Sequence, residues 1–189
     1  MTDAQPTDSR PTDTPPTDAP AAEAGRDALE AWIDAGEKGD AEAAGAALAD
    51  NIVLISPITD RFTFTGRDEV VDLLRDVFDV ISGIHYVRVD RTPSSAVLFV
   101  EARIGDLAIN EAQFVDFDPE GNISTLTLFF RPLTASTRFL RELGPRVARR
   151  QGNAGTARTL AAAGLFLDSV AASGDRRFVP MAAPASSRG

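Results

Sequence analysis

The chain lacks cysteine altogether and has a single histidine, His85, among its 189 residues. The absence of cysteine excludes a disulfide framework, thiolate catalysis and cysteine-ligated metal sites. One histidine excludes a histidine-rich metal site. Carboxylates alone can hold a hard cation, but no calcium-loop spacing occurs, and there is no glycine-rich phosphate loop. We therefore expect neither a metal nor a cofactor.

Long apolar runs are absent too. The longest, Leu160–Leu167, is far shorter than the roughly 20 residues that span a membrane. The first twenty residues show neither a basic start nor an apolar segment, the two marks of a signal peptide. The sequence therefore predicts a cytoplasmic protein without a membrane partner.

Charge is distributed unevenly along a chain whose formal net charge is −9. Residues 25–132 carry twenty acidic and nine basic side chains, whereas residues 133–189 carry three acidic and nine basic ones. The acidic body argues against nucleic acid as a partner. The basic C-terminal part is expected to lie against the acidic body, to be solvated, or to bind an anionic partner.

The first 24 residues repeat the triplet Pro-Thr-Asp and are predicted to be a disordered leader, because such residues cannot form a core. Helical spacing of Leu29, Trp32 and Ile33 predicts a first helix, and Asp40 is suited to cap a second. The further expected elements are strands at 51–56 and 61–65, a helix after Gly66, strands at 84–91, 95–104, 107–117 and 122–131, and helices around 135–150 and 157–172.

Short turns between the last four strands require antiparallel neighbours. The sequence predicts the α+β class, with a cone-shaped curved antiparallel sheet and three N-terminal helices packed over its concave face. This domain is expected at residues 25–133. A C-terminal helical extension at 134–172 and a flexible tail at 173–189 follow it.

Three stretches stand out in this order: "ALEAWIDAGEKGDAEAAGAALADNIVLISP", "FTGRDEVVDLLRDVF" and "QFVDFDPEGNISTLTLFFRP". Together they resemble the nuclear transport factor 2-like superfamily, which includes the SnoaL-like and ketosteroid-isomerase-like folds. The resemblance implies a pocket for a small, often apolar molecule and a homodimer formed through the sheet. Members include isomerases, dehydratases, epoxide hydrolases, polyketide cyclases and non-catalytic binders, so the fold does not select a function.

Alignment with the ketosteroid-isomerase branch implies three site positions, occupied here by Trp32, Ser56 and Gln113. That branch has a tyrosine and two carboxylic acids there, so its chemistry, which needs a positioned base, is not expected. The neutral groups are suited to hold a carbonyl or hydroxyl of a small apolar molecule. Each also has a structural explanation: Trp32 as core, Ser56 as a strand end, and Gln113 on a solvent-facing side of the sheet.

Charged and aromatic candidates lie on neighbouring strands. Glu101 and Arg103 share a strand face and are expected to meet Glu111, either as a catalytic group or as a surface ion-pair cluster. His85 is expected to face the cone as a base near Glu101, or to lie at the rim. Tyr86 is then expected to face outward.

Phe129 belongs to a group of strand phenylalanines that either line the pocket or pack in the core. The leading interpretation is a small-molecule-binding domain with a mostly apolar pocket. If it is an enzyme, we expect an isomerase, lyase or hydrolase with His85 or Glu101 as base. The alternative is a non-catalytic dimerisation or protein-interaction module whose pocket is filled by side chains.

Overall fold

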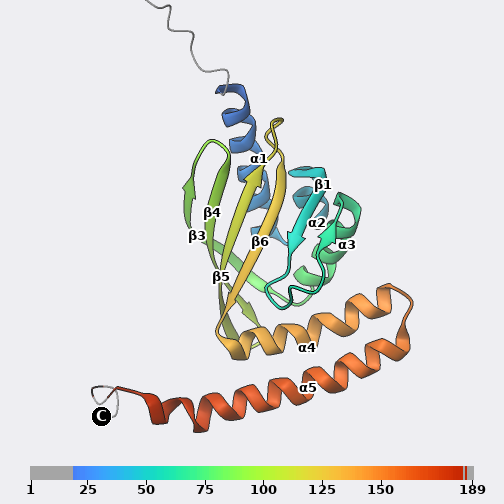
Figure 1. Ribbon diagram of the computed structural model, residues 1–189, viewed down its shortest axis with the longest axis vertical. Coiled ribbons are helices and arrows are strands. Elements are labelled where there is room, and N and C mark those ends of the chain that lie inside the picture. The colour runs from blue at the N-terminus through green and yellow to red at the C-terminus, as the bar shows by residue number, and fades with distance from the viewer. Residues whose placement is uncertain (1–18, 185, 187–189) are drawn as a thin grey trace, which may run out of the picture.

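The computed structural model describes residues 19–184 and 186, and its elements follow the expected order (Figure 1). The helices are α1 (Ala19–Lys38), α2 (Ala41–Ala46), α3 (Arg67–Phe78), α4 (Leu133–Arg150) and α5 (Ala154–Arg177), with a short 3₁₀ turn, η1 (Val179–Ala182). The strands are β1 (Leu48–Ile55), β2 (Phe64–Thr65), β3 (Ser82–Arg91), β4 (Ser95–Ile104), β5 (Leu107–Phe117) and β6 (Ile123–Arg131).

The two chain ends differ from the expectation. Residues 19–24, assigned to the leader by composition, form the first turns of α1, because alanine and glutamate there favour helix. The rest of the predicted leader lies outside the described residues. Residues 173–177, assigned to a flexible tail, continue α5, and η1 follows them.

Local signals set the helix boundaries. Gly39 adopts a φ of 68° just after α1, a conformation that glycine reaches without steric cost. Asp40 then caps α2, since its Oδ1 accepts a hydrogen bond from the backbone N–H of Ala43 at 3.0 Å. Pro132 stands between β6 and α4, where it cannot continue a sheet ladder. Gly39 and Asp40 therefore separate α1 from α2 before the sheet begins, and Pro132 separates the sheet from α4.

The six strands form one sheet in the order β2-β1-β6-β5-β4-β3. The expected antiparallel pairing of β3 to β6 is confirmed, and β1 and β2 also pair antiparallel. β1 and β6 instead run parallel. This pairing is possible because a helix and four strands separate β1 from β6 in the chain and supply the long connection that parallel strands need.

The helices cover one face of the curved sheet and one of its ends. α1, α2 and α3 lie behind the sheet in Figure 1, α4 crosses below it, and α5 forms an outer layer beneath α4. Ion pairs join the basic α4 to the acidic α3 region: Arg146 with Asp79 at 3.3 Å and Arg150 with Asp76 at 3.0 Å. The C-terminal extension therefore lies against the acidic body, one of the expected arrangements.

Among residues 19–184, no helix combines the length and the apolar character needed to cross a membrane.

Candidate ligand-binding site

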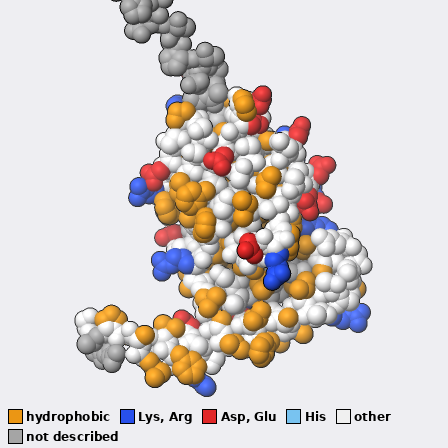
Figure 2. Space-filling model, in the orientation of Figure 1, with side chains coloured by type: hydrophobic (Ala, Val, Ile, Leu, Met, Phe, Trp, Pro, Cys, Tyr) orange, Lys and Arg blue, Asp and Glu red, His pale blue; other side chains and the backbone are white. Residues whose placement is uncertain are grey.

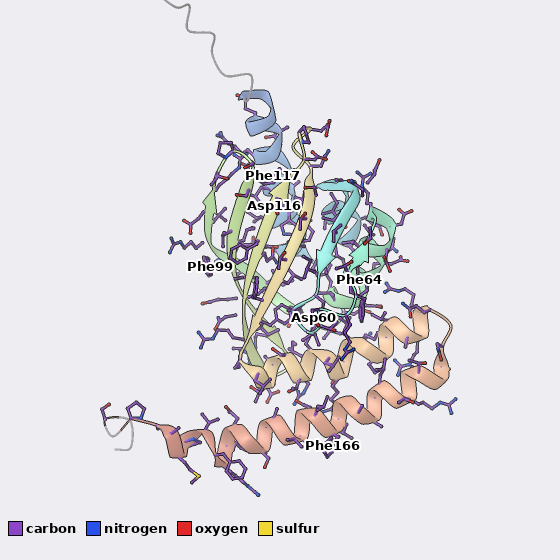
Figure 3. All side chains as sticks on the ribbon, in the orientation of Figure 1. Asp60, Phe64, Phe99, Asp116, Phe117 and Phe166 are labelled. Carbon is purple, nitrogen blue, oxygen red and sulfur yellow. The ribbon has the colours of Figure 1, made fainter. Side chains whose placement is uncertain are left out.

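A cavity of about 450 Å³ lies between the sheet and the helices that cover it. Side chains from α1, α3, β1, β5 and β6 form its inner walls, and α4 closes it with Phe139, Leu143 and Val147. The loop between β1 and β2, where Figure 3 labels Asp60, contributes the adjacent Thr59. The volume of the cavity falls within the range of about 300–1,000 Å³ that is typical of small-molecule sites.

The side chains of β5 alternate as the sequence predicts. Ile109, Gln113 and Val115 are buried on the helix side, and Glu111 and Gln113 line the cavity. The even-numbered Asn110 and Phe114 are exposed on the other face. Gln113 is therefore not on a solvent-facing side of the sheet, because the period of two directs it under the helices.

Three polar side chains form a hydrogen-bonded chain in the cavity wall. Trp32 Nε1 donates to Gln113 Oε1 at 2.9 Å, and Gln113 Nε2 donates to Glu111 Oε1 at 3.0 Å. An indole can only donate, so Trp32 fixes which end of the amide faces Glu111. The structure thus brings together Trp32, Gln113 and Glu111, which the sequence analysis assigned to two separate groups.

Glu111 is the carboxylic acid in the wall of this cavity. Burial raises the pKa of its carboxyl to about 7, and the hydrogen bond from Gln113 opposes the rise only in part. In the described part of the chain, the residues that line the cavity include no lysine, arginine or histidine to stabilise the carboxylate. Glu111 is therefore poised between its neutral and charged forms near neutral pH.

Tyr86 completes the polar end of the cavity, and its predicted outward orientation is wrong. Burial first, and then the charge of Glu111, raise the pKa of the phenol well above its usual range, while hydrogen bonding to Gln113 and Trp32 opposes the rise. The hydroxyl packs against Gly36, where an added Cβ would lie 2.5 Å from it. The strand pattern did not predict Tyr86 in the cavity, because an irregularity in the pairing of β3 with β4, between Tyr86 and Arg88, reverses which side chains face inward.

Glu101 and Arg103 do not join Glu111, so the expected three-residue group is wrong. Glu101 pairs with Asn110 across β4 and β5, whereas Glu111 pairs with Val100, so the two carboxylates project from opposite faces. Arg103 donates to the backbone carbonyl of Asp106 at 2.7 Å in the exposed turn that follows. One position of register separates a cavity residue from a surface residue.

His85 lies outside the cavity, which agrees with the second expectation for this residue, a position at the rim. Its side chain is 69% exposed, and Nδ1 is hydrogen-bonded to Glu37 Oε1 at 2.9 Å. It does face Glu101 across the β3–β4 pair, but neither residue lines the cavity. The expectation that His85 or Glu101 acts as a base in the cavity is thus corrected, because neither side chain reaches it.

Phe129 is also on the outer face, where its ring packs edge-on against Phe114 with centroids 5.5 Å apart. The neighbouring Phe130 lines the cavity in its place. Ser56 does line the cavity, and its Oγ accepts a hydrogen bond from the backbone N–H of Ile58 at 3.2 Å. Ser56 therefore both shapes the end of β1 and presents a hydroxyl to the cavity.

A steroid delta-isomerase from Pseudomonas aeruginosa is similar over 68% of this chain and 95% of its own, with 23% sequence identity and a TM-score of 0.63. A protein with a cystatin-like fold from Silicibacter pomeroyi is similar over 68% of this chain and 93% of its own, with 23% identity and a TM-score of 0.62. None of the curated proteins matches.

These structural likenesses show the fold. The sequence itself matches the model of the SnoaL-like domain over residues 29–126, which is more than half of the chain and contains Trp32, Tyr86, Glu111 and Gln113. As the resemblance to the nuclear transport factor 2-like superfamily predicted, the chain belongs to the SnoaL-like domain family.

Proposed function

We propose that the protein binds a small, mainly apolar molecule in the cavity and anchors one carbonyl or hydroxyl oxygen of it at the Glu111 end. The observation that carries the proposal is the Glu111 carboxyl, which faces an apolar cavity with one protein hydrogen bond, from Gln113. A carboxyl group has further donor or acceptor capacity that a ligand oxygen would satisfy. Buried polar groups that lack partners are costly, so such a group selects ligands that complete its bonding.

Two probes of matched shape test this proposal. 2-Naphthol carries a hydroxyl where 2-methylnaphthalene carries a methyl group, and binding is followed through the fluorescence of Trp32, the only tryptophan of the chain. We expect 2-naphthol to bind about tenfold more tightly, the equivalent of one hydrogen bond to a group that is charged or nearly so. Glu111→Leu should abolish that preference, and Glu111→Gln should retain part of it.

The outcomes separate the parts of the proposal. If neither probe binds, the cavity is not a ligand site. If both bind equally well to the wild-type protein, the cavity takes apolar molecules but Glu111 does not anchor them. The alternative with a pocket filled by side chains is less well supported, since about 450 Å³ is open.

The pKa of about 7 supports a second candidate function, proton transfer by Glu111. In this reaction the carboxylate removes a proton from the carbon beside a ligand carbonyl, and Tyr86 donates a hydrogen bond to the oxygen that becomes negative. Returning the proton restores the ligand. The test is deuterium uptake from heavy water into 2-tetralone: the protein should accelerate it, and Glu111→Gln should remove the acceleration.

We also propose that the outer face of the sheet joins two copies of the chain. Its support is a group of exposed aromatic side chains on the adjacent strands β4, β5 and β6: Phe99, Phe114 and Phe129. Figure 2 shows hydrophobic side chains gathered on the face of the sheet that is turned to the viewer. Monomers rarely expose such contiguous apolar patches. Light scattering should give a dimer mass for the wild-type protein and a monomer mass for Phe129→Glu; two equal masses would argue against this interface.

A further inference from the structure

Helix α5 is attached to the rest of the protein by a single face. Its buried residues are Ala157, Gly164 and Asp168. Gly164 sits so close to α4 that an added Cβ would lie 2.7 Å from the Cα of Arg141. Asp168 is 4% exposed and accepts hydrogen bonds from Arg138 and Arg141, both at 2.9 Å. The orientation of α5 about its own axis is therefore fixed, and its opposite face is turned away from α4.

That opposite face is apolar and uncovered. Phe166 is 68% exposed and Val170 54%, and Figure 3 shows Phe166 on the side of α5 remote from α4. Exposed apolar side chains continue beyond the helix at Phe178, Val179 and Met181. In Figure 2 hydrophobic side chains accordingly lie along the left and central parts of the lower edge of the molecule. Exposed apolar side chains grouped along one edge of a protein in this way mark an interaction surface.

Arginines accompany the apolar strip. Arg158, Arg176 and Arg177 are exposed and form no ion pair with any residue of the described chain. Arg177 follows Phe166 by eleven residues, about three helical turns, so it lies on the same side of α5. Asp175 follows Phe166 by nine residues, about two and a half turns, so its Cα lies on the side of α5 opposite to Phe166. The acidic Asp168 is already neutralised by two arginines. The uncovered face is therefore cationic as well as apolar.

We propose that this face of α5, with the segment Phe178–Met181, docks on the surface of an anionic lipid bilayer with the helix lying in the plane of the interface. Large apolar side chains flanked by arginines are the features that let a helix insert one face between lipid headgroups. The acidic body, with twenty acidic and nine basic residues in 25–132, would be repelled and so held on the far side.

Charge argues for lipid over the other occupants. A second copy of the chain would bring two cationic α5 faces together, and these faces would repel each other. Nucleic acid would match the arginines but leave Phe166, Val170 and Phe178 without an apolar partner. The sequence predicted no membrane partner, because the strip becomes visible only once the face that α4 covers is known. The inference is independent of the ligand cavity.

Co-sedimentation of the full chain with vesicles tests the proposal. We expect the protein to bind phosphatidylcholine vesicles that contain phosphatidylserine about tenfold more strongly than phosphatidylcholine alone, and rising salt should weaken this binding. Phe166→Glu should lower the binding about tenfold, because a charge replaces the centre of the apolar strip. The double variant Arg176→Glu, Arg177→Glu should abolish the preference for phosphatidylserine.

Matched controls carry the same changes elsewhere. Val87→Glu alters another exposed apolar side chain, on β3, and Arg61→Glu with Arg88→Glu removes two other exposed arginines. These variants should bind vesicles like the wild-type protein. Equal binding to both kinds of vesicle, no binding, binding of a DNA duplex in place of vesicles, or a lipid-free oligomer that Phe166→Glu dissociates would each overturn the proposal.

Discussion

Trp32 in α1 and Gln113 in β5 are joined by a hydrogen bond of 2.9 Å across 81 positions of the chain. This bond satisfies the indole N–H of a residue that is 3% exposed, and it turns the amide so that Gln113 Nε2 faces Glu111. One contact therefore fixes helix to sheet and sets the polarity of the cavity. Its two partners serve both the fold and the candidate site.

Replacing Gln113 by leucine should destabilise the protein by about 1–3 kcal/mol, because the buried indole N–H of Trp32 loses its acceptor. The free energy of unfolding in urea measures the change. Adding Trp32→Phe to the same chain removes the orphaned donor, so the double variant should be less destabilised than the sum of the two single variants. Strict additivity would show that the two side chains do not interact in solution.

Stability should also depend on the protonation of Glu111. Its pKa is raised from 4.5 in the unfolded chain to about 7 in the folded protein, so between these values the folded state binds more protons. The contribution of Glu111 to the free energy of unfolding is therefore most favourable below about pH 4.5. It falls by up to about 3 kcal/mol as the pH rises through 7.

The matched variant Glu111→Gln isolates this effect, because it keeps the shape and cannot ionise. The difference in unfolding free energy between wild type and variant should change between about pH 5 and pH 8, with the wild type losing relative stability at the higher pH. Other carboxyl groups cancel in the comparison. A difference that stays constant with pH would mean that Glu111 is ordinarily solvated.

The fold was predictable because its signals are local. Period-two alternation in β4 and β5, turn residues between the strands and the Asp40 cap each determine an element from its own residues. The inward orientation of Gln113 follows from the same alternation once helices cover one face. What the sequence predicted best are features that neighbouring residues decide together.

The errors in the site have a different origin. Placing Tyr86 required knowing the irregularity in β3, and separating Glu111 from Glu101 required the register between β4 and β5. Both are properties of paired strands, and a single residue of shift reverses the face. The α4 wall and the uncovered face of α5 depend in turn on tertiary packing, which periodicity within one helix does not specify.

Gly36→Ala tests the position of Tyr86. The new methyl group would lie 2.5 Å from the tyrosine hydroxyl, so the ring must move toward the cavity. Alanine stabilises the helix by about 1 kcal/mol, which offsets much of the steric cost, so the melting temperature should change little. Calorimetric binding of 2-naphthol should weaken markedly, and adding Tyr86→Phe should restore part of it. Unchanged binding would place Tyr86 away from the ligand.

Asp168→Asn should loosen α5 from α4. The carboxylate is buried and accepts from Arg138 and Arg141, and these hydrogen bonds hold its pKa below its usual value despite burial. Losing its charge removes the one buried anion that these two partly buried arginines share, a cost of about 2–3 kcal/mol, since breaking a fully buried pair costs somewhat more. Hydrogen exchange along α5 should rise, while exchange in β4 and β5 stays unchanged.

Asp106→Asn is the control. Asp106 also pairs with Arg138, at 3.6 Å, but the side chain of Asp106 is 84% exposed, so the loss of its charge should cost less than about 1 kcal/mol. Equal effects of the two variants would show that Asp168 does not hold the helices together.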